Sequence, residues 1–240
     1  MPAPFSRDCQ ISGDAVATRS PLPNVAAALQ KSKTIRILAI GASAARRSTR
    51  GGHIGGILQQ AIKGLDVVMI NRGVSGELAA QAAARITTEV ALNEPDLVLW
   101  QIGTNDALAY VPLADLETTI VDTVRWLKEH NVDVVLVGLQ YVNSMEQDDN
   151  YRAVRDLIRR IGTQENVMIV RRPEAQRMLS HAAVSGGGLE PDEFERSEAG
   201  YTCLAQYVAR AITLGLFGAG NPPRQPQQPA PLRPAPAPQN

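Results

Sequence analysis

The chain has 240 residues, of which 44% are apolar and 4% aromatic, so its length allows one large α/β domain or two small ones. Its 24 basic residues are balanced by 24 acidic residues, and this zero formal net charge argues against a protein that mainly binds nucleic acid or an anionic membrane. The longest apolar runs, such as residues 134–137, are far shorter than the roughly 20 residues of a transmembrane helix. The sequence therefore predicts a soluble protein.

The two ends of the chain differ from its middle. Residues 218–240 are rich in Pro, Gln, Ala and Gly, with too little apolar surface to offset the entropy of folding, which predicts a disordered tail. Residues 1–33 are predicted to form an N-terminal extension over the domain surface. Residues 1–10 lack the apolar stretch of a signal peptide, so we expect either a cytoplasmic protein or a periplasmic or secreted one whose export signal lies upstream of this sequence.

Between the ends, short apolar segments alternate with longer segments of helical periodicity. The short segments are apolar almost throughout, which is typical of strands buried on both faces of a parallel sheet. The predicted strands are 34–40, 65–70, 97–102, 133–139 and 167–170, and the predicted helices are 53–63, 77–92, 113–130, 150–163, 173–183 and 197–214. This alternation predicts a three-layer, doubly wound (flavodoxin-like) α/β domain over residues 34–217, with a sheet of about five parallel strands.

Small and polar residues follow each of the first three predicted strands. The segments are Gly-Ala-Ser at 41–43, Asn-Arg-Gly-Val-Ser-Gly at 71–76 and Gly-Thr-Asn-Asp at 103–106. Because ligands of such sheets bind beyond the carboxyl ends of the strands, we expect a hydroxyl, a glycine amide and a carboxamide on one rim. A nucleophile beside hydrogen-bond donors is what acyl transfer requires, although ordinary loops contain the same residue types.

Taken together in this order, the segments 41–43, 71–76 and 103–105 resemble the sequence blocks of the SGNH (GDSL) hydrolase family. The resemblance covers residues 34–214 and includes a C-terminal block, which in the family reads Asp-x-x-His followed by Gly-Tyr and here runs from Asp192 to Tyr201. The segments 97–105 and 200–205 resemble a bacterial, often exported, subgroup of the family.

The resemblance implies a role for individual residues. Ser43 would be the nucleophile, and its backbone amide, the amide of Gly73 and the side-chain amide of Asn105 would hold the oxyanion of a tetrahedral intermediate. Asp192 would orient a general base three residues later. The implied activity is that of a serine esterase or acetyl hydrolase acting on a small-molecule or glycan ester, with no metal or cofactor.

Two positions depart from the family pattern. Ala42 stands where the family often has Asp, but that residue does not accept the proton. Glu195 occupies the place of the catalytic histidine, and a carboxylate with an ordinary pKa of about 4.3 is a poor base for a serine hydroxyl at neutral pH. Asp192 beside it would raise the pKa of one of the two carboxyl groups. Two hypotheses therefore stay open: an esterase with an altered, weakened triad, or a non-catalytic relative that binds an acylated or carbohydrate ligand in the same cleft.

Other residues carry weaker signals. Of the three histidines, His130 is predicted at the opposite edge of the sheet, while His53 and His181 lie closer in sequence to the site segments; each is interpreted as a surface residue. A run of glycines at 51–56 lacks the lysine of a phosphate-binding loop. Three arginines beyond the predicted nucleophile favour an anionic substrate or are simply solvated: Arg46, Arg47 and Arg50.

The chain contains two cysteines, Cys9 and Cys203. Two thiols do not make a metal site or a disulfide-dense scaffold by themselves, and the residues alone leave open whether they pair or are unrelated. The subgroup that the chain resembles commonly has a cysteine near each end. The resemblance therefore implies a Cys9–Cys203 disulfide between the N-terminal extension and the last helix.

Overall fold

The computed structural model describes residue 9 and residues 17–42, 52–140, 142–172 and 197–217. Five parallel strands form one sheet in the order β2-β1-β3-β4-β5. The sheet confirms the predicted fold class, and each strand begins and ends within two residues of its predicted bounds. The strands are β1 (Thr34–Gly41), β2 (Asp66–Asn71), β3 (Leu97–Gln101), β4 (Asp133–Val137) and β5 (Met168–Val170).

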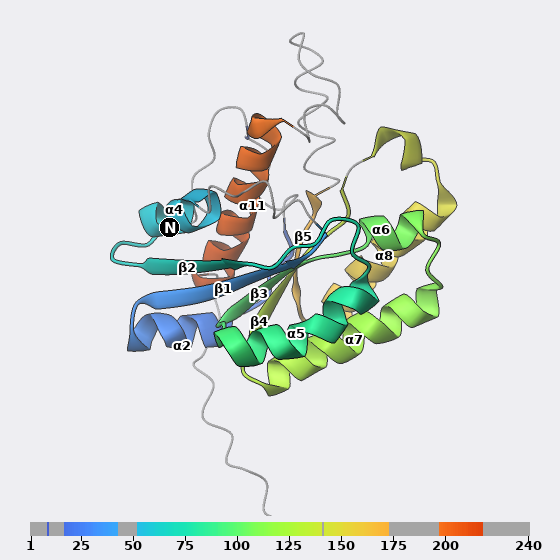
Figure 1. The fold of residues 1–240 in the computed structure, drawn as a ribbon. Coiled ribbons are helices and arrows are strands. Elements are labelled where there is room, and N and C mark those ends of the chain that lie inside the picture. The colour runs from blue at the N-terminus through green and yellow to red at the C-terminus, as the bar shows by residue number, and fades with distance from the viewer. Residues whose placement is uncertain (1–8, 10–16, 43–51, 141, 173–196, 218–240) are drawn as a thin grey trace, which may run out of the picture.

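Helices cover both faces of this sheet (Figure 1). The helices α4 and α11 pack on one another over one face, and α5, α7 and α8 cover the other. Five predicted helices are confirmed, whereas α2, α6 and the short 3-10 helix η2 were not predicted; the predicted helix 173–183 and the predicted tail lie outside the described residues. The helices are α2 (Pro23–Lys31), α4 (Gly52–Ala61), α5 (Ala79–Asn93), α6 (Thr104–Leu108), α7 (Leu113–Glu129), η2 (Asn143–Met145), α8 (Asp149–Gln164) and α11 (Glu198–Phe217).

The side chains of each strand alternate between two apolar layers. In β1, Ile35, Ile37 and Ala39 pack in the layer of α2, α4 and α11, whereas Leu38 and Ile40 pack in the layer of α5, α7 and α8. The same alternation runs through β3, β4 and β5. Because both faces of a doubly wound sheet are covered, its strands read as nearly continuous apolar segments.

The helices follow from their apolar stripes. In α7, the buried residues Leu116, Ile120, Val124 and Leu127 recur at spacings of three and four, which puts them on one face of the helix. The chain reverses after α7 at Asn131, whose φ of 59° lies in the left-handed region that Asn tolerates better than most residues.

The strand register brings the carboxyl ends of the strands to one edge of the sheet. Gly41 pairs with Gln101, Gln101 with Val137 and Val137 with Val170. On the other side of β1, Asn71 pairs with Ala39. Because β2 and β3 lie on opposite sides of β1, the order of the strands reverses at the end of β1, where ligands of such folds bind. We call this side of the sheet the carboxyl edge.

Part of the N-terminal extension pairs with the last strand. Ala17 forms an isolated antiparallel bridge with Val170, and the amide of Thr18 donates to the backbone oxygen of Ile169 over 3.0 Å. Residues 17 and 18 therefore extend the hydrogen bonding of the sheet beyond β5.

Asp133, the first residue of β4, holds the N-terminus of α2. Its carboxylate accepts hydrogen bonds of 2.9 Å from the backbone amides of Asn24 and Val25 and from the side-chain amide of Asn24. The residue before the helix, Leu22, provides no side-chain cap. A carboxylate at this position satisfies free amides of the first turn and suits the positive end of the helix dipole.

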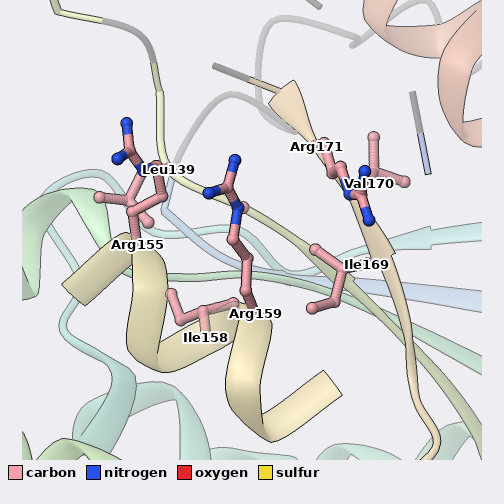
Figure 2. A pocket seen from close by; sticks show the side chains of 8 residues that line it. Leu139, Arg155, Ile158, Arg159, Ile169, Val170 and Arg171 are labelled. Carbon is pink, nitrogen blue, oxygen red and sulfur yellow. The ribbon is translucent and has the colours of Figure 1, made fainter. Parts of the chain in front are cut away.

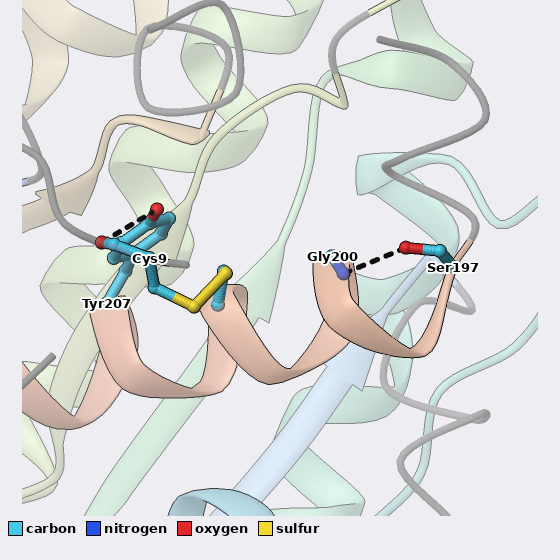
Figure 3. The surroundings of a disulfide bond; sticks show 5 residues. Cys9, Ser197, Gly200 and Tyr207 are labelled. Carbon is cyan, nitrogen blue, oxygen red and sulfur yellow. Dashed lines mark hydrogen bonds between the residues drawn. A yellow bond between two sulfur atoms is a disulfide. The ribbon is translucent and has the colours of Figure 1, made fainter. Parts of the chain in front are cut away.

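A disulfide joins Cys9 to Cys203 of α11, with 5.2 Å between the Cα atoms (Figure 3). This confirms the pairing that the family resemblance implied. The hydroxyl of Tyr207 donates to the backbone oxygen of Cys9 over 3.4 Å, and burial raises the pKa of Tyr207 above its ordinary value. None of the described helices combines the length and the apolar character needed to cross a membrane.

Candidate active site

The turn after β1 is held tightly between its two neighbouring strands. Gly41 has a φ of 98°, and a Cβ at this position would lie 2.1 Å from the backbone oxygen of Gln101, so no side chain fits there. The amide of Ala42 donates to that same oxygen over 3.2 Å, while Val74 donates its amide to the oxygen of Gly41 over 3.0 Å. The predicted nucleophile, Ser43, is the next residue and lies outside the described part of the chain.

Gln101 and Arg172 form a buried polar pair next to the same turn. With its amide oriented to satisfy both neighbours, Gln101 donates through Nε2 to the oxygen of Ala42 over 3.1 Å and accepts through Oε1 from Nη1 of Arg172 over 2.8 Å. Arg172 is 2% exposed, and Gln101 is also buried. Gln101 therefore contacts Ala42 through both its backbone and its side chain, directly before position 43.

Gly73 lies in the loop after β2. Its amide donates to Oδ1 of Asn71 over 3.1 Å, and the amide of Arg72 donates to the oxygen of Ala39 over 2.8 Å. An isolated parallel bridge pairs Val74 with Ala42. The residue directly before the predicted nucleophile thus pairs with the residue directly after Gly73, although the Gly73 amide itself is engaged by a side chain.

Asn105 belongs to α6, directly after β3. Its side-chain nitrogen donates to the backbone oxygen of Glu77 over 2.9 Å; an Asn amide carries two N–H donors, so this bond uses one of them. The neighbouring Asp106, 1% exposed, accepts from the amides of Gly103 and Ala79 over 3.1 and 2.9 Å. Asp106 therefore links the turn that contains Asn105 to Ala79, the first residue of α5.

An ion pair between Glu77 and Arg85 stabilises the loop between β2 and α5. Both carboxylate oxygens of Glu77 accept from Arg85, at 2.8 Å from Nε and 3.0 Å from Nη2, and these bonds hold the pKa of Arg85 above its ordinary value. Nη2 of Arg85 also donates to the backbone oxygen of Arg72 over 2.8 Å. Glu89 lies on the outer side of this group, 3.0 Å from Arg72 and 3.7 Å from Arg85. The pair thereby ties the segment around Gly73 to the residue that receives the Asn105 hydrogen bond.

The predicted base residues, Asp192 and Glu195, lie outside the described residues. The described chain stops before them at Arg172, just after β5, and resumes at Ser197, whose hydroxyl accepts from the amide of Gly200 over 3.1 Å and caps α11 (Figure 3). Near the other end of α11, a Cβ on Gly215 would lie 2.7 Å from Cε of Met168, the first residue of β5. Helix α11 therefore runs antiparallel to β5, and its first turn lies toward the carboxyl edge.

Of the remaining sequence candidates, the structure describes His130 and the helix position of His53. His130 follows α7 and precedes β4, at the opposite edge as predicted, where its ring stacks on Trp126 with 3.9 Å between ring centroids. His53 is the second residue of α4, while His181 and the three arginines at 46, 47 and 50 lie outside the described residues. Within the described ranges, no group of three or more His, Cys, Asp and Glu residues is arranged to hold a metal ion.

The sequence analysis missed the residues that support this edge. Asp106 stands three residues after Gly103, a spacing typical of a residue that returns a hydrogen bond to the start of a helix, so it was detectable. Gln101 and Arg172 give no such signal, because they come from separate strand ends. Glu77 and Arg85 lie eight residues apart, which is not a spacing that predicts an ion pair on a helix.

Comparisons with known proteins agree with this geometry. The model of the non-GDSL lipase-like family matches residues 8–216. An acetylxylan esterase of Geobacillus stearothermophilus is 25% identical over 177 residues, covering 67% of this chain and 78% of the relative. An arylesterase of Vibrio mimicus is 29% identical over 77 residues, which span 32% of this chain and only 38% of the relative.

Solved structures show the same fold. A two-domain esterase described as active on acetylated mannans superposes with a TM-score of 0.68 at 19% identity, over 93% of this chain and 62% of that one. Since the family model covers most of the chain, including all five strands and the segments after them, the chain belongs to the non-GDSL lipase-like family of the SGNH (GDSL) hydrolases.

Proposed function

We propose that this protein is a serine esterase that hydrolyses an acyl ester, with Ser43 as the nucleophile. The observation that carries the proposal is the convergence of three strand ends: Ala42 pairs with Val74 beside Gly73, and Asn105 is bound to the same loop through Glu77. This arrangement supports the proposal, because Ser43 directly follows Ala42 in the sequence. Membership of a hydrolase family agrees with it.

The proposed reaction proceeds through an acyl-enzyme. The oxygen of Ser43 attacks the ester carbonyl, its proton passes to the base, and the carbonyl oxygen becomes an oxyanion held by donors from Gly73 and Asn105. Collapse of this intermediate releases the alcohol, which takes the proton, and leaves the acyl group on Ser43. Water then attacks the acyl group by the same steps and releases the carboxylic acid.

The two proposed oxyanion donors, Asn105 and Gly73, differ in the hydrogen bonds that they already make. Asn105 has a second N–H that its bond to Glu77 does not use. The amide of Gly73 donates to Asn71, so the substrate oxygen has to share or replace the Asn71 carbonyl as its acceptor. We expect Asn105→Ala to lower kcat about 10²–10³-fold, which is typical of the loss of one oxyanion donor.

The residue at the position of the general base favours a second candidate function. Glu195 stands where the family pattern has histidine, and a carboxylate paired with Asp192 is a weaker and less well oriented base than an imidazole. A protein that binds an acylated or carbohydrate ligand without turning it over would keep Asn105 and Gly73 while tolerating Glu195.

Hydrolysis of 4-nitrophenyl acetate separates the two functions. An esterase gives a rate above background that Ser43→Ala abolishes, and Glu195→His raises this rate because it restores an imidazole three residues after Asp192. Rates at background for both the unchanged protein and Ser43→Ala would overturn the esterase proposal. Binding of acetylated xylan or mannan without acetate release would then support the second candidate.

We further propose that the substrate is an acetyl ester of a glycan and that the protein works in an oxidising compartment. Acetylated glycans are the substrates named for two of the similar proteins, and disulfides such as Cys9–Cys203 persist outside the reducing cytosol. Acetate release from acetylated xylan and mannan, compared with 4-nitrophenyl acetate, tests the first point. Cell fractionation tests the second, and a purely cytosolic protein would contradict it.

A further inference from the structure

Two hydrogen bonds connect a buried cation to the backbone carbonyl of Ala42, just before the predicted nucleophile. In the amide orientation that satisfies both neighbours, Nε2 of Gln101 donates to the oxygen of Ala42 over 3.1 Å, and Nη1 of Arg172 donates to Oε1 of Gln101 over 2.8 Å. Gln101 is 7% exposed and Arg172 is 2% exposed. Because an arginine guanidinium keeps its positive charge in proteins, a charged donor orients the side chain that binds Ala42.

The sheet brings Gln101 and Arg172 together from separate strands. Gln101 is the last residue of β3, Arg172 lies two residues after the end of β5, and β4 lies between these strands. Leu99 of β3 and Val170 of β5 both pack in the layer of α2, α4 and α11, and the side chains two residues further on point to the same face. Arg171, the residue between, instead lines a small pocket with residues of α8 (Figure 2). The pair therefore spans the end of β4 on the α11 face of the sheet.

The carbonyl of Ala42 and the backbone amide of Ser43 belong to one peptide group. The Ser43 amide is also predicted to be an oxyanion donor, together with Gly73 and Asn105. When a peptide oxygen accepts a hydrogen bond, its group becomes more polarised and its N–H becomes a stronger donor, because linked hydrogen bonds reinforce one another. The reinforcement is larger at a buried site, where the effective dielectric constant is low. The bond from Gln101 to Ala42 therefore acts on the amide of the next residue.

We propose that Gln101 and Arg172 are positioning residues that strengthen the Ser43 amide as an oxyanion donor. Arg172 orients the amide of Gln101 so that Nε2 donates to Ala42. The substrate oxygen becomes an oxyanion only as the tetrahedral intermediate forms, so the contribution raises kcat and leaves substrate binding unchanged. This catalytic effect rests on the proposed esterase function, whereas the polarisation of the peptide group is a property of the folded protein.

The polarisation of this peptide group can be measured without any turnover. The sequence contains a single Ala-Ser step, at 42–43, so full-length protein carrying ¹³C in its alanine carbonyls and ¹⁵N in its serine amides gives one carbonyl–amide correlation by NMR. We expect the ¹³C and ¹⁵N frequencies of this correlation to move upfield in Gln101→Met, because the carbonyl loses its donor. Gln101→Glu should move them in the same direction, since a carboxylate accepts from Arg172 but does not donate to Ala42.

Thr104→Val is the matched control for the loss of a buried hydrogen bond. Thr104 lies three residues after Gln101, is 7% exposed, and accepts from the amide of Gln140 over 2.7 Å, a bond that does not involve Ala42. We expect the labelled correlation to keep its position in this variant. Frequencies that stay unchanged in both Gln101 variants, or that move as far in Thr104→Val, would overturn the proposal. Gln101→Glu keeps an acceptor for Arg172, so the test remains possible if Gln101→Met does not fold.

The catalytic effect is measured by hydrolysis of 4-nitrophenyl acetate. Loss of a whole oxyanion donor costs about 10²–10³ in kcat, and linked hydrogen bonds strengthen one another by about 10–30%. A free energy reduced by that fraction corresponds to a fall in kcat of about two- to eightfold in Gln101→Met, with KM unchanged. Asn105→Ala should lower kcat by the same factor with or without Gln101→Met, because Asn105 is a separate donor.

Two results would overturn the catalytic part: a change in KM alone, or a loss in Gln101→Met that vanishes beside Asn105→Ala. If the unchanged protein hydrolyses no ester, the proposed function fails. The NMR frequencies alone then decide whether Gln101 polarises the peptide group.

Discussion

Glu77 binds Arg85 through both carboxylate oxygens, at 2.8 and 3.0 Å, from a side chain that is 4% exposed. The two residues connect both predicted oxyanion donors. Arg85 reaches the backbone oxygen of Arg72, next to Gly73, and the backbone oxygen of Glu77 receives the hydrogen bond of Asn105. The ion pair therefore sets the separation between two donors that come from different strand ends.

Replacing Glu77 by Gln is expected to reduce turnover without weakening substrate binding. The variant removes the charge that holds Arg85 while keeping the backbone oxygen that binds Asn105, so the loop moves relative to the oxyanion. We expect kcat on 4-nitrophenyl acetate to fall about tenfold or more, with KM within twofold and partial recovery in Glu77→Asp. Glu89→Gln is the control, because Glu89 contacts the same arginine at 3.7 Å. An unchanged kcat in Glu77→Gln would show that the pair does not position the donors.

The sequence predicts candidate site residues but not the residues that contact Gly73, Asn105 and the turn after β1 in the structure. Gly73 and Asn105 were predicted because they follow apolar segments directly, and a parallel sheet brings such positions to one edge. Gln101 was predicted only as part of a strand. Its side chain gains a positioning role from Arg172, which comes from another strand end, and no local spacing relates the two.

Gly41→Ala is expected to destabilise the fold and abolish any Ser43-dependent activity. A non-glycine residue in this left-handed conformation costs about 1–3 kcal/mol, and the added Cβ would lie 2.1 Å from the oxygen of Gln101. Gly64→Ala is the matched control, because Gly64 also has a positive φ, of 78°, but its nearest neighbours are side-chain atoms of Lys33 at 4.0 Å. Urea unfolding of both variants measures the difference. Equal losses of stability would mean that backbone conformation alone, and not the contact with Gln101, requires a glycine.

Helix α2 shows why the extension was predicted less well than the domain. The helix begins at Pro23, and the residue before it provides no side-chain cap. The carboxylate that accepts from the amides of its first turn belongs to Asp133, which lies 109 residues after Asn24. The helix is also only nine residues long, and isolated helices of that length are marginal in water. Its formation depends on tertiary contacts that no window around residue 23 contains.

Asp133→Ala is expected to lower the free energy of unfolding by about 1–3 kcal/mol, because the amides of Asn24 and Val25 lose their acceptor. Asp66→Ala is the control: Asp66 is likewise the first residue of a strand but is exposed. Amide hydrogen exchange should show loss of protection in α2 for Asp133→Ala only. If both variants unfold at the same urea concentration, the carboxylate does not stabilise the start of α2.

The disulfide between Cys9 and Cys203 is expected to stabilise the protein by fastening the N-terminal extension to α11. The bond closes a loop with a sequence separation of 194 residues, and removal of a native disulfide costs about 2–5 kcal/mol, chiefly by freeing the unfolded chain. Reductant should therefore lower the urea midpoint of the unchanged protein. In the double variant Cys9→Ala, Cys203→Ala the midpoint should already be lowered, and reductant should have no further effect. If reductant leaves the midpoint of the unchanged protein where it was while free-thiol titration shows the bond to be broken, the contacts of Tyr207 and α11 hold the extension without it.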